Sequence, residues 1–139
     1  MEAEKLPKDV LNALARFRGN GGASSQSVAV LRKSFPGIPE DYFAFLQTFD
    51  GGEGVVGSNA YLMLWRASEL FELNEAYEVA QYAPGLLLIG SDGGGEAFAF
   101  DLRQERPLIV QVPFVGMDLA LSEQLGSSFC EFIRYLERL

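Results

Sequence analysis

Apolar residues recur at intervals of three and four along several parts of the chain, which is the spacing of one face of an α-helix. The clearest helix begins at Pro39 and ends before Gly51. Its buried stripe has four members: Tyr42, Phe45, Leu46 and Phe49. Further helices are predicted at residues 9–17, 27–35 and 69–79, and from Ser127 or Ser128 to near the C-terminus. The last of these begins with capping-box spacing between Ser128 and Glu131.

Short apolar runs in the second half of the chain predict strands. Alternation is clearest at residues 96–101, where Phe98 and Phe100 share a face. The predicted strands are residues 60–65, 86–90, 96–101, 108–112 and 117–121. Because helices flank these strands without strict βαβ alternation, we expect an α+β fold with a largely antiparallel sheet. The length of 139 residues fits one domain, 1–139, in which residues 1–26 form a helix and a Gly-rich loop.

A first glycine-rich segment follows the helix that begins at Pro39. Gly52, Gly54 and Gly57 match the G-x-G-x-x-G spacing of dinucleotide-binding loops. That motif needs a strand before it and a helix after it, whereas here a helix precedes and a strand follows. We therefore interpret the segment as a helix stop followed by a mobile loop.

A second glycine run, Gly93 to Gly95, lies between Asp92 and Glu96. A phosphate cradle would need a helix N-terminus after the glycines, and a strand follows instead. The two acids leave a calcium loop open, although the oxygen array of an EF-hand is lacking. The favoured interpretation is a hairpin connection at residues 91–95, in which Asp92 bonds to the turn and the glycines supply positive φ.

Catalytic chemistry finds little support in the chain. There is no histidine, so Ser-His-Asp and Cys-His mechanisms are excluded. The single cysteine, Cys130, is interpreted as a packing residue of the last helix. The carboxylates of Asp92, Glu96 and Asp101, or of Asp50 and Glu53, could converge, but nothing in the sequence fixes such a pair. We expect no enzymatic activity, no cofactor and no metal.

The acidic residues are concentrated in the middle of the chain. The net charge is −8, and residues 40–101 hold eleven acidic residues against one base, Arg66, which gives −10. Such a field repels nucleic acid and attracts basic proteins. The alternative is that the acids only keep the domain in solution. The first ten residues lack the apolar core of a signal peptide and no apolar run could span a membrane, so a cytoplasmic location is expected.

One predicted helix face combines acids with an apolar side chain. On residues 69–79, glutamates spread over the side opposite Leu70, Leu73 and Tyr77, and an aromatic residue falls among them. An aromatic side chain within an acidic rim resembles an interaction hot spot. The candidate partner-binding residues are Asp50, Glu53, Glu69, Phe71, Glu72, Glu75 and Glu78. A merely solvated helix face is the alternative.

Four segments in order resemble the SMI1/KNR4 (SUKH) superfamily. They are "IPEDYFAFLQTFDGGEG", the stretch from Trp65 to Asn74, "LLLIGSDGGGEAFAFD" and "SSFCEFIRYL". The resemblance covers about residues 27 to 139. The chain departs from the family pattern at Asp50, where Asn is common, and at Glu96, where Asp is common.

The resemblance implies an α+β fold without known catalysis, and its motifs are interpreted as fold determinants. Bacterial members are regarded as immunity proteins that neutralise polymorphic toxins, often nucleases, and fungal members regulate cell-wall synthesis as interaction hubs. We therefore expect a protein-binding module with a basic toxin domain as partner, of the bacterial immunity type. A regulatory or scaffold domain without a toxin partner is the alternative, and sequence alone does not choose between them.

Overall fold

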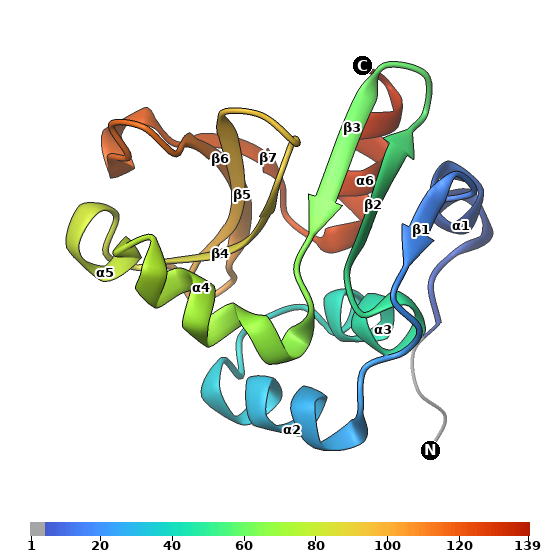
Figure 1. Ribbon diagram of the computed structural model, residues 1–139, viewed down its shortest axis with the longest axis horizontal. Helices are drawn as coiled ribbons and strands as arrows, with labels where there is room; N and C mark the ends of the chain where they lie inside the picture. The colour runs from blue at the N-terminus through green and yellow to red at the C-terminus, as the bar shows by residue number, and fades with distance from the viewer. Residues whose placement is uncertain (1–4) are drawn as a thin grey trace.

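Seven strands form one antiparallel sheet, in which each strand pairs with the next along the chain (Figure 1). The computed structural model describes residues 5–139; residues 1–4, where the predicted N-terminal segment 1–26 begins, lie outside them. The strands are β1 (Phe17–Gly19), β2 (Gly52–Val56), β3 (Ala60–Leu64), β4 (Leu86–Ser91), β5 (Glu96–Asp101), β6 (Leu108–Pro113) and β7 (Glu123–Gly126). This sheet confirms the predicted α+β fold.

Six α-helices and two 3-10 turns accompany the sheet within the described residues. They are α1 (Lys8–Ala13), α2 (Ser25–Ser34), α3 (Glu40–Phe49), η1 (Ala67–Glu69), α4 (Leu70–Ala76), α5 (Val79–Tyr82), η2 (Leu119–Leu121) and α6 (Phe129–Glu137). Side-chain caps fix two of the beginnings: Ser24 accepts the N–H of Ser27, and Ser128 accepts the N–H of Glu131, both at 3.1 Å. The predicted Ser128 cap of the last helix is therefore confirmed, whereas the Glu131 carboxylate accepts from the hydroxyl of Ser127 and does not complete a capping box.

The main core lies between one face of the sheet and the helices α3 and α6. Side chains alternate along a strand, so Phe98 and Phe100 of β5 both point into this core. The ring of Tyr42 on α3 lies 5.1 Å from that of Phe100, and the ring of Phe132 on α6 lies 4.8 Å from that of Phe98. Tyr42 of the stripe predicted for α3 and the buried face of α6 thus pack against the sheet.

A smaller core covers the opposite face of β4, β5 and β6. Ala97 and Ala99, which alternate with the phenylalanines of β5, contribute to it. Their small side chains leave room for Val79 and Ala83 from the α5 region, which are both buried. The α5 region therefore packs on the face of the sheet that α3 and α6 leave open, whereas Leu70 of α4 belongs to the main core.

The sheet divides between β3 and β4, which pair over Met63 with Ser91 and Leu64 with Gly90. A bulge interrupts the β4–β5 register between Leu88 and Gly90. A Cβ at Gly90 would lie 2.0 Å from the carbonyl oxygen of Met63, so only glycine allows this close approach. Beyond the short overlap the two halves separate, and α4 lies alongside β4 (Figure 1).

Three predictions for the strands and loops are wrong. The mobile loop after α3 is the strand β2, and Phe17, placed at the end of a helix, begins β1, which pairs with β2. A Cβ at Gly52 would lie 2.1 Å from the carbonyl oxygen of Arg18, so the glycine that suggested a loop permits close strand pairing. Residues 117–121 contain a 3-10 turn in place of the predicted strand, because the carboxylate of Asp118 accepts the N–H of Ala120 at 2.9 Å.

Candidate partner-binding surface

The helix α4 is fixed to the sheet by one amide side chain. Asn74 donates from Nδ2 to the carbonyl of Leu88 at 2.9 Å, and its Oδ1 accepts the N–H of Leu88 at 2.8 Å. The side chain thus pairs with both backbone groups of Leu88, as a neighbouring strand would. A further bond from Nδ2 to the carbonyl of Leu70, at 2.8 Å, ties the amide to its own helix. Helix α4 is therefore a rigid part of the scaffold.

The predicted helix at residues 69–79 is interrupted before its end. Helix α4 stops at Ala76, and Glu78 adopts a left-handed conformation with φ of 54° before α5 begins. Tyr77, predicted to be buried with Leu70, has an exposed fraction of 44%. Its ring stacks on Trp65, with the centroids 5.9 Å apart, and lies 4.9 Å from that of Phe114. The break turns the chain toward the sheet and changes the direction in which the later residues point.

Two of the candidate carboxylates form hydrogen bonds within the chain. Asp50 ends α3 in a left-handed conformation, and its Oδ1 accepts the N–H of Ala67 at 2.9 Å. Glu69 accepts the N–H of Arg66 at 3.0 Å and so caps η1. Both groups position the segment that leads from β3 into α4.

Glu53 lies on the exposed side of β2, apart from the α4 residues. Its carboxylate accepts a hydrogen bond from the hydroxyl of Tyr61, which raises the pKa of that hydroxyl. Together with Glu69, Arg18 and Trp65 it borders a polar hollow of about 340 Å³. The structure therefore separates Glu53 from the acids farther along α4.

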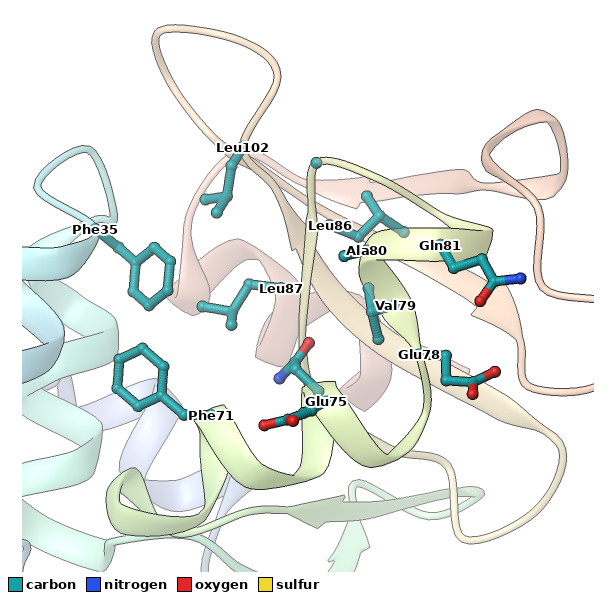
Figure 2. Close-up of a pocket in the computed structure, with 12 residues that line it drawn as sticks. Phe35, Phe71, Glu75, Glu78, Val79, Ala80, Gln81, Leu86, Leu87 and Leu102 are labelled. Carbon is teal, nitrogen blue, oxygen red and sulfur yellow. The ribbon is translucent and has the colours of Figure 1, made fainter.

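Three candidate residues lie together: Phe71, Glu75 and Glu78 line a groove of about 500 Å³ between α4, α5 and β4 (Figure 2). We call it the α4–α5 groove. Its other lining residues come from separate segments: Phe35, Asn74, Val79, Ala80, Gln81, Gly85, Leu86, Leu87 and Leu102. The volume is within the range of about 300–1,000 Å³ that is usual for ligand pockets. Glu72 is exposed on α4 and does not line the groove.

Phe71 is exposed, as predicted, with an exposed fraction of 47%. Its ring stacks on that of Phe35, with the centroids 5.8 Å apart and the planes inclined by 23°. Phe35 follows α2 and lies 36 positions earlier in the sequence. The sequence gives no sign that these two aromatic residues meet, because nothing local connects them.

Among residues 5–139, the glutamates of α4 have no ion-pair partner. The ion pairs formed by residues 5–139 join Arg32 to Glu40, Arg103 to Asp101 and Arg134 to Asp9. Arg103, whose side chain lies beside Gly85 at the groove, makes bonds of 2.9 and 2.8 Å to the two carboxylate oxygens of Asp101. This hydrogen bonding lowers the pKa of Asp101. This basic group beside Gly85 is therefore already paired.

The glycine hairpin is a turn, as predicted. The carboxylate of Asp92 accepts the N–H groups of Gly94, at 2.8 Å, and of Glu96, at 3.2 Å. Only Gly93 of the three glycines has a left-handed φ, of 81°, so the expectation of positive φ for the other two is wrong. Asp101 is at the opposite end of β5 from Glu96 and pairs with Arg103. Within residues 5–139, no group of three or more Cys, Asp or Glu side chains could hold a metal ion.

Cys130 is a packing residue, as predicted, and belongs to the buried face of α6. Its backbone N–H donates to the carboxylate of Asp41 on α3. Asp41, a residue of the "IPEDYFAFLQTFDGGEG" motif, therefore joins α3 to α6 in the main core.

The comparison with models of protein families agrees with this architecture. A search of curated proteins returned no match. Among the described residues, no helix combines the length and the apolar character needed to cross a membrane. The model of the SMI1/KNR4 family (SUKH-1) matches residues 22–135, which run from the loop before α2 into α6. The protein belongs to the SMI1/KNR4 (SUKH-1) family.

Proposed function

We propose that the protein is a non-enzymatic binding module that neutralises a basic toxin domain, as expected of an immunity protein. Membership of the SUKH family supports a protein partner. The observation that carries the proposal is the surface of α4. Phe71 is half-exposed there, and Glu72, Glu75 and Glu78 make no ion pair with any residue from 5 to 139.

This combination favours binding over solubility alone. A solvated helix face needs only charges, and the part of the Phe71 ring that stays exposed beside Phe35 costs free energy in contact with water. An aromatic side chain within a charged rim is the usual composition of an interaction hot spot. Toxins that cleave nucleic acid need basic surfaces for their substrate, and an acidic inhibitor complements such a surface.

The hydrogen bonds and the ion pair formed by three other acids also argue against catalysis. Asp92 holds a turn, Asp101 pairs with Arg103, and Asp50 binds the backbone of Ala67. These three carboxylates therefore position the chain, and they are not gathered around a common cavity.

The test is co-expression with the product of an adjacent toxin gene. We expect the two proteins to co-purify and the host cells to be protected. Glu72→Lys and Glu75→Lys should slow association and weaken its dependence on salt, and Phe71→Ala should speed dissociation. Glu123→Lys, at an exposed position of β7, is the matched control and should leave both rates unchanged.

Two results would contradict the proposal in different ways. If no adjacent toxin binds, the immunity role fails and a regulatory or scaffold role takes its place. If a toxin binds with unchanged rates in all three α4 variants, the acidity of α4 serves solubility and the interface lies elsewhere.

A further inference from the structure

We propose that the α4–α5 groove receives one large apolar side chain of the partner protein, carried on a segment in which Lys or Arg residues flank that side chain and pair with Glu75 and Glu78. This inference rests on the proposed function and specifies the chemistry of the partner segment. Three features of the groove lead to it: its lining, its charge and its rigidity.

The floor and one wall of the groove are apolar. Leu86, Leu87 and Val79 form buried parts of the floor, and the stacked rings of Phe35 and Phe71 form the wall, as Figure 2 shows. Covering this surface with another apolar group removes it from water, which is favourable. The groove therefore favours a hydrophobic occupant.

Two amide side chains line the groove, and the less exposed one, Asn74, is already hydrogen-bonded within the chain. Both the nitrogen and the oxygen of the Asn74 side chain are bonded to Leu70 and Leu88. Pockets for small polar ligands place a few convergent polar groups among apolar ones. With the Asn74 amide already used, the interior selects by shape and hydrophobicity, which suits a side chain delivered by a protein.

The charge of the groove is at its edge. Glu75 and Glu78 are exposed and lack an ion pair among residues 5–139, and Gln81 is the other long polar side chain of the lining. A Lys or Arg on the partner can lay its aliphatic stem along the apolar floor while its charge reaches a glutamate. A segment with acidic residues in the same places would meet like charges and be rejected.

The walls are fixed before a partner arrives. The Asn74 clamp holds α4 on β4, and the stacking of Phe35 on Phe71 joins the end of α2 to α4. A preformed groove does not have to be ordered on binding, and this reduces the entropic cost of association. A short peptide is therefore a sufficient probe.

The experiment uses the whole chain and three fluorescein-labelled peptides of nine residues. The first has Trp at its centre with two Lys on each side, the second replaces Trp with Ala, and the third replaces the four Lys with Glu. Fluorescence polarisation at low salt should show the first peptide binding at least about tenfold more tightly than either of the others. Amide shifts in NMR spectra should cluster at the lining residues of the groove.

Variants of the groove have matched controls on the same surface. Ala80→Arg introduces a long cation at an exposed lining position and should abolish binding of the first peptide, whereas Ala76→Arg, exposed but outside the groove, should not. Glu75→Gln and Glu78→Gln should each weaken binding by about two- to fivefold, and Glu123→Gln should have no effect. Far-UV circular dichroism verifies that each variant is folded.

The result that overturns the inference is equal binding of the three peptides, or shifts that map outside the groove. This outcome is separate from failure of the proposed function. If a toxin binds and is neutralised with unchanged affinity by the Ala80→Arg protein, the groove is excluded while the immunity role stands. If no toxin binds but the peptide preferences and shifts are found, the groove is retained and the immunity role is rejected.

Discussion

Removal of the Asp41 carboxylate should destabilise the protein more than removal of any other hydrogen-bonded carboxylate described above. Asp41 lies in the first turn of α3 and is buried. Its Oδ2 accepts the N–H of Cys130 at 2.9 Å, and its Oδ1 accepts that of Phe129 at 3.3 Å. Ser128 satisfies the next donor, the N–H of Glu131. Asp41 therefore caps the first turn of α6 from another helix, with its negative charge at the positive end of the α6 dipole.

The magnitude follows from these two bonds. A hydrogen bond to a charged group contributes about 1.5–3 kcal/mol, and the 3.3 Å bond belongs at or below the lower end. Asp41→Ala should therefore lower the free energy of unfolding by roughly 3 kcal/mol. Asp41→Asn keeps one acceptor but loses the charge, so about 1–2 kcal/mol is expected. For a chain of this length, 3 kcal/mol corresponds to a decrease in Tm of about 10 °C.

Urea denaturation followed by circular dichroism measures both variants, and an unchanged m-value shows that the unfolded state is comparable. Ser128→Ala, at the same helix end, is the reference and should cost about 1 kcal/mol. An Asp41→Ala protein whose free energy of unfolding lies within about 0.5 kcal/mol of the wild type would refute the reasoning. Asp41 would then be an incidental neighbour of α6.

Three further predictions concern single positions. Arg103 lowers the pKa of Asp101 below its ordinary value of 3.8, so the ionised Asp101 stabilises the fold above about pH 4 and this stabilisation is lost as the pH falls. The free energy of unfolding of the Asp101→Asn variant, measured in urea, should therefore be lower than that of the wild type at pH 7. The two values should approach each other near pH 2.5. Gly93→Ala should lower the free energy of unfolding by about 1 kcal/mol or more, because Gly93 has a φ of 81°. Gly95→Ala should be tolerated, because nothing lies within 4 Å of a Cβ added there. Thermal melts compare the two variants. The buried hydroxyl of Tyr42 has no hydrogen-bond partner in the described structure. Tyr42→Phe should therefore leave the free energy of unfolding, measured by urea titration, unchanged or raise it by up to about 1 kcal/mol. A decrease of more than about 1 kcal/mol would reveal a missing partner.

The parts of the fold that the sequence predicted well depend on local signals. Helices α3 and α6 have complete apolar stripes, and Ser128 marks the start of α6. The β4–β5 hairpin combines two apolar runs with a turn in which Asp92 bonds to the backbone. Each of these features is decided by residues that are close together in the sequence.

The strands β1 and β2 depend instead on residues far apart in the sequence. Phe17 pairs with Gly54, and the glycines of β2 allow the backbone of β1 to approach closely. In a local reading, a glycine-rich segment after a helix indicates a loop, because the partner strand that stabilises it is not considered. The break at Glu78 is similar, since a non-glycine residue in a left-handed conformation carries no local signal and is held by the packing of Val79 on the sheet.

The candidate site was predicted in part. The exposed aromatic ring and the acids of α4 follow from helical periodicity. The groove does not, because its walls join Phe35, the residues of α4 and α5, the start of β4 and Leu102. Periodicity also could not reveal that Asp50 and Glu69 bind backbone N–H groups, since both partners come after turns whose direction the tertiary structure decides.

The family motifs do not identify a partner, because the acids within them have structural roles. The motif acids hold the fold: Asp41 caps α6, Asp50 positions η1, and Asp92 closes the hairpin. Glu72, Glu75 and Glu78, on and just after α4, form no ion pair among residues 5–139. Substitution of a motif acid leaves backbone donors unsatisfied, whereas substitution on α4 changes charge and shape at exposed positions and costs little stability. If the proposed α4–α5 groove is the recognition surface, its specificity can change while the motifs stay fixed, and the chemistry of the groove then identifies the partner.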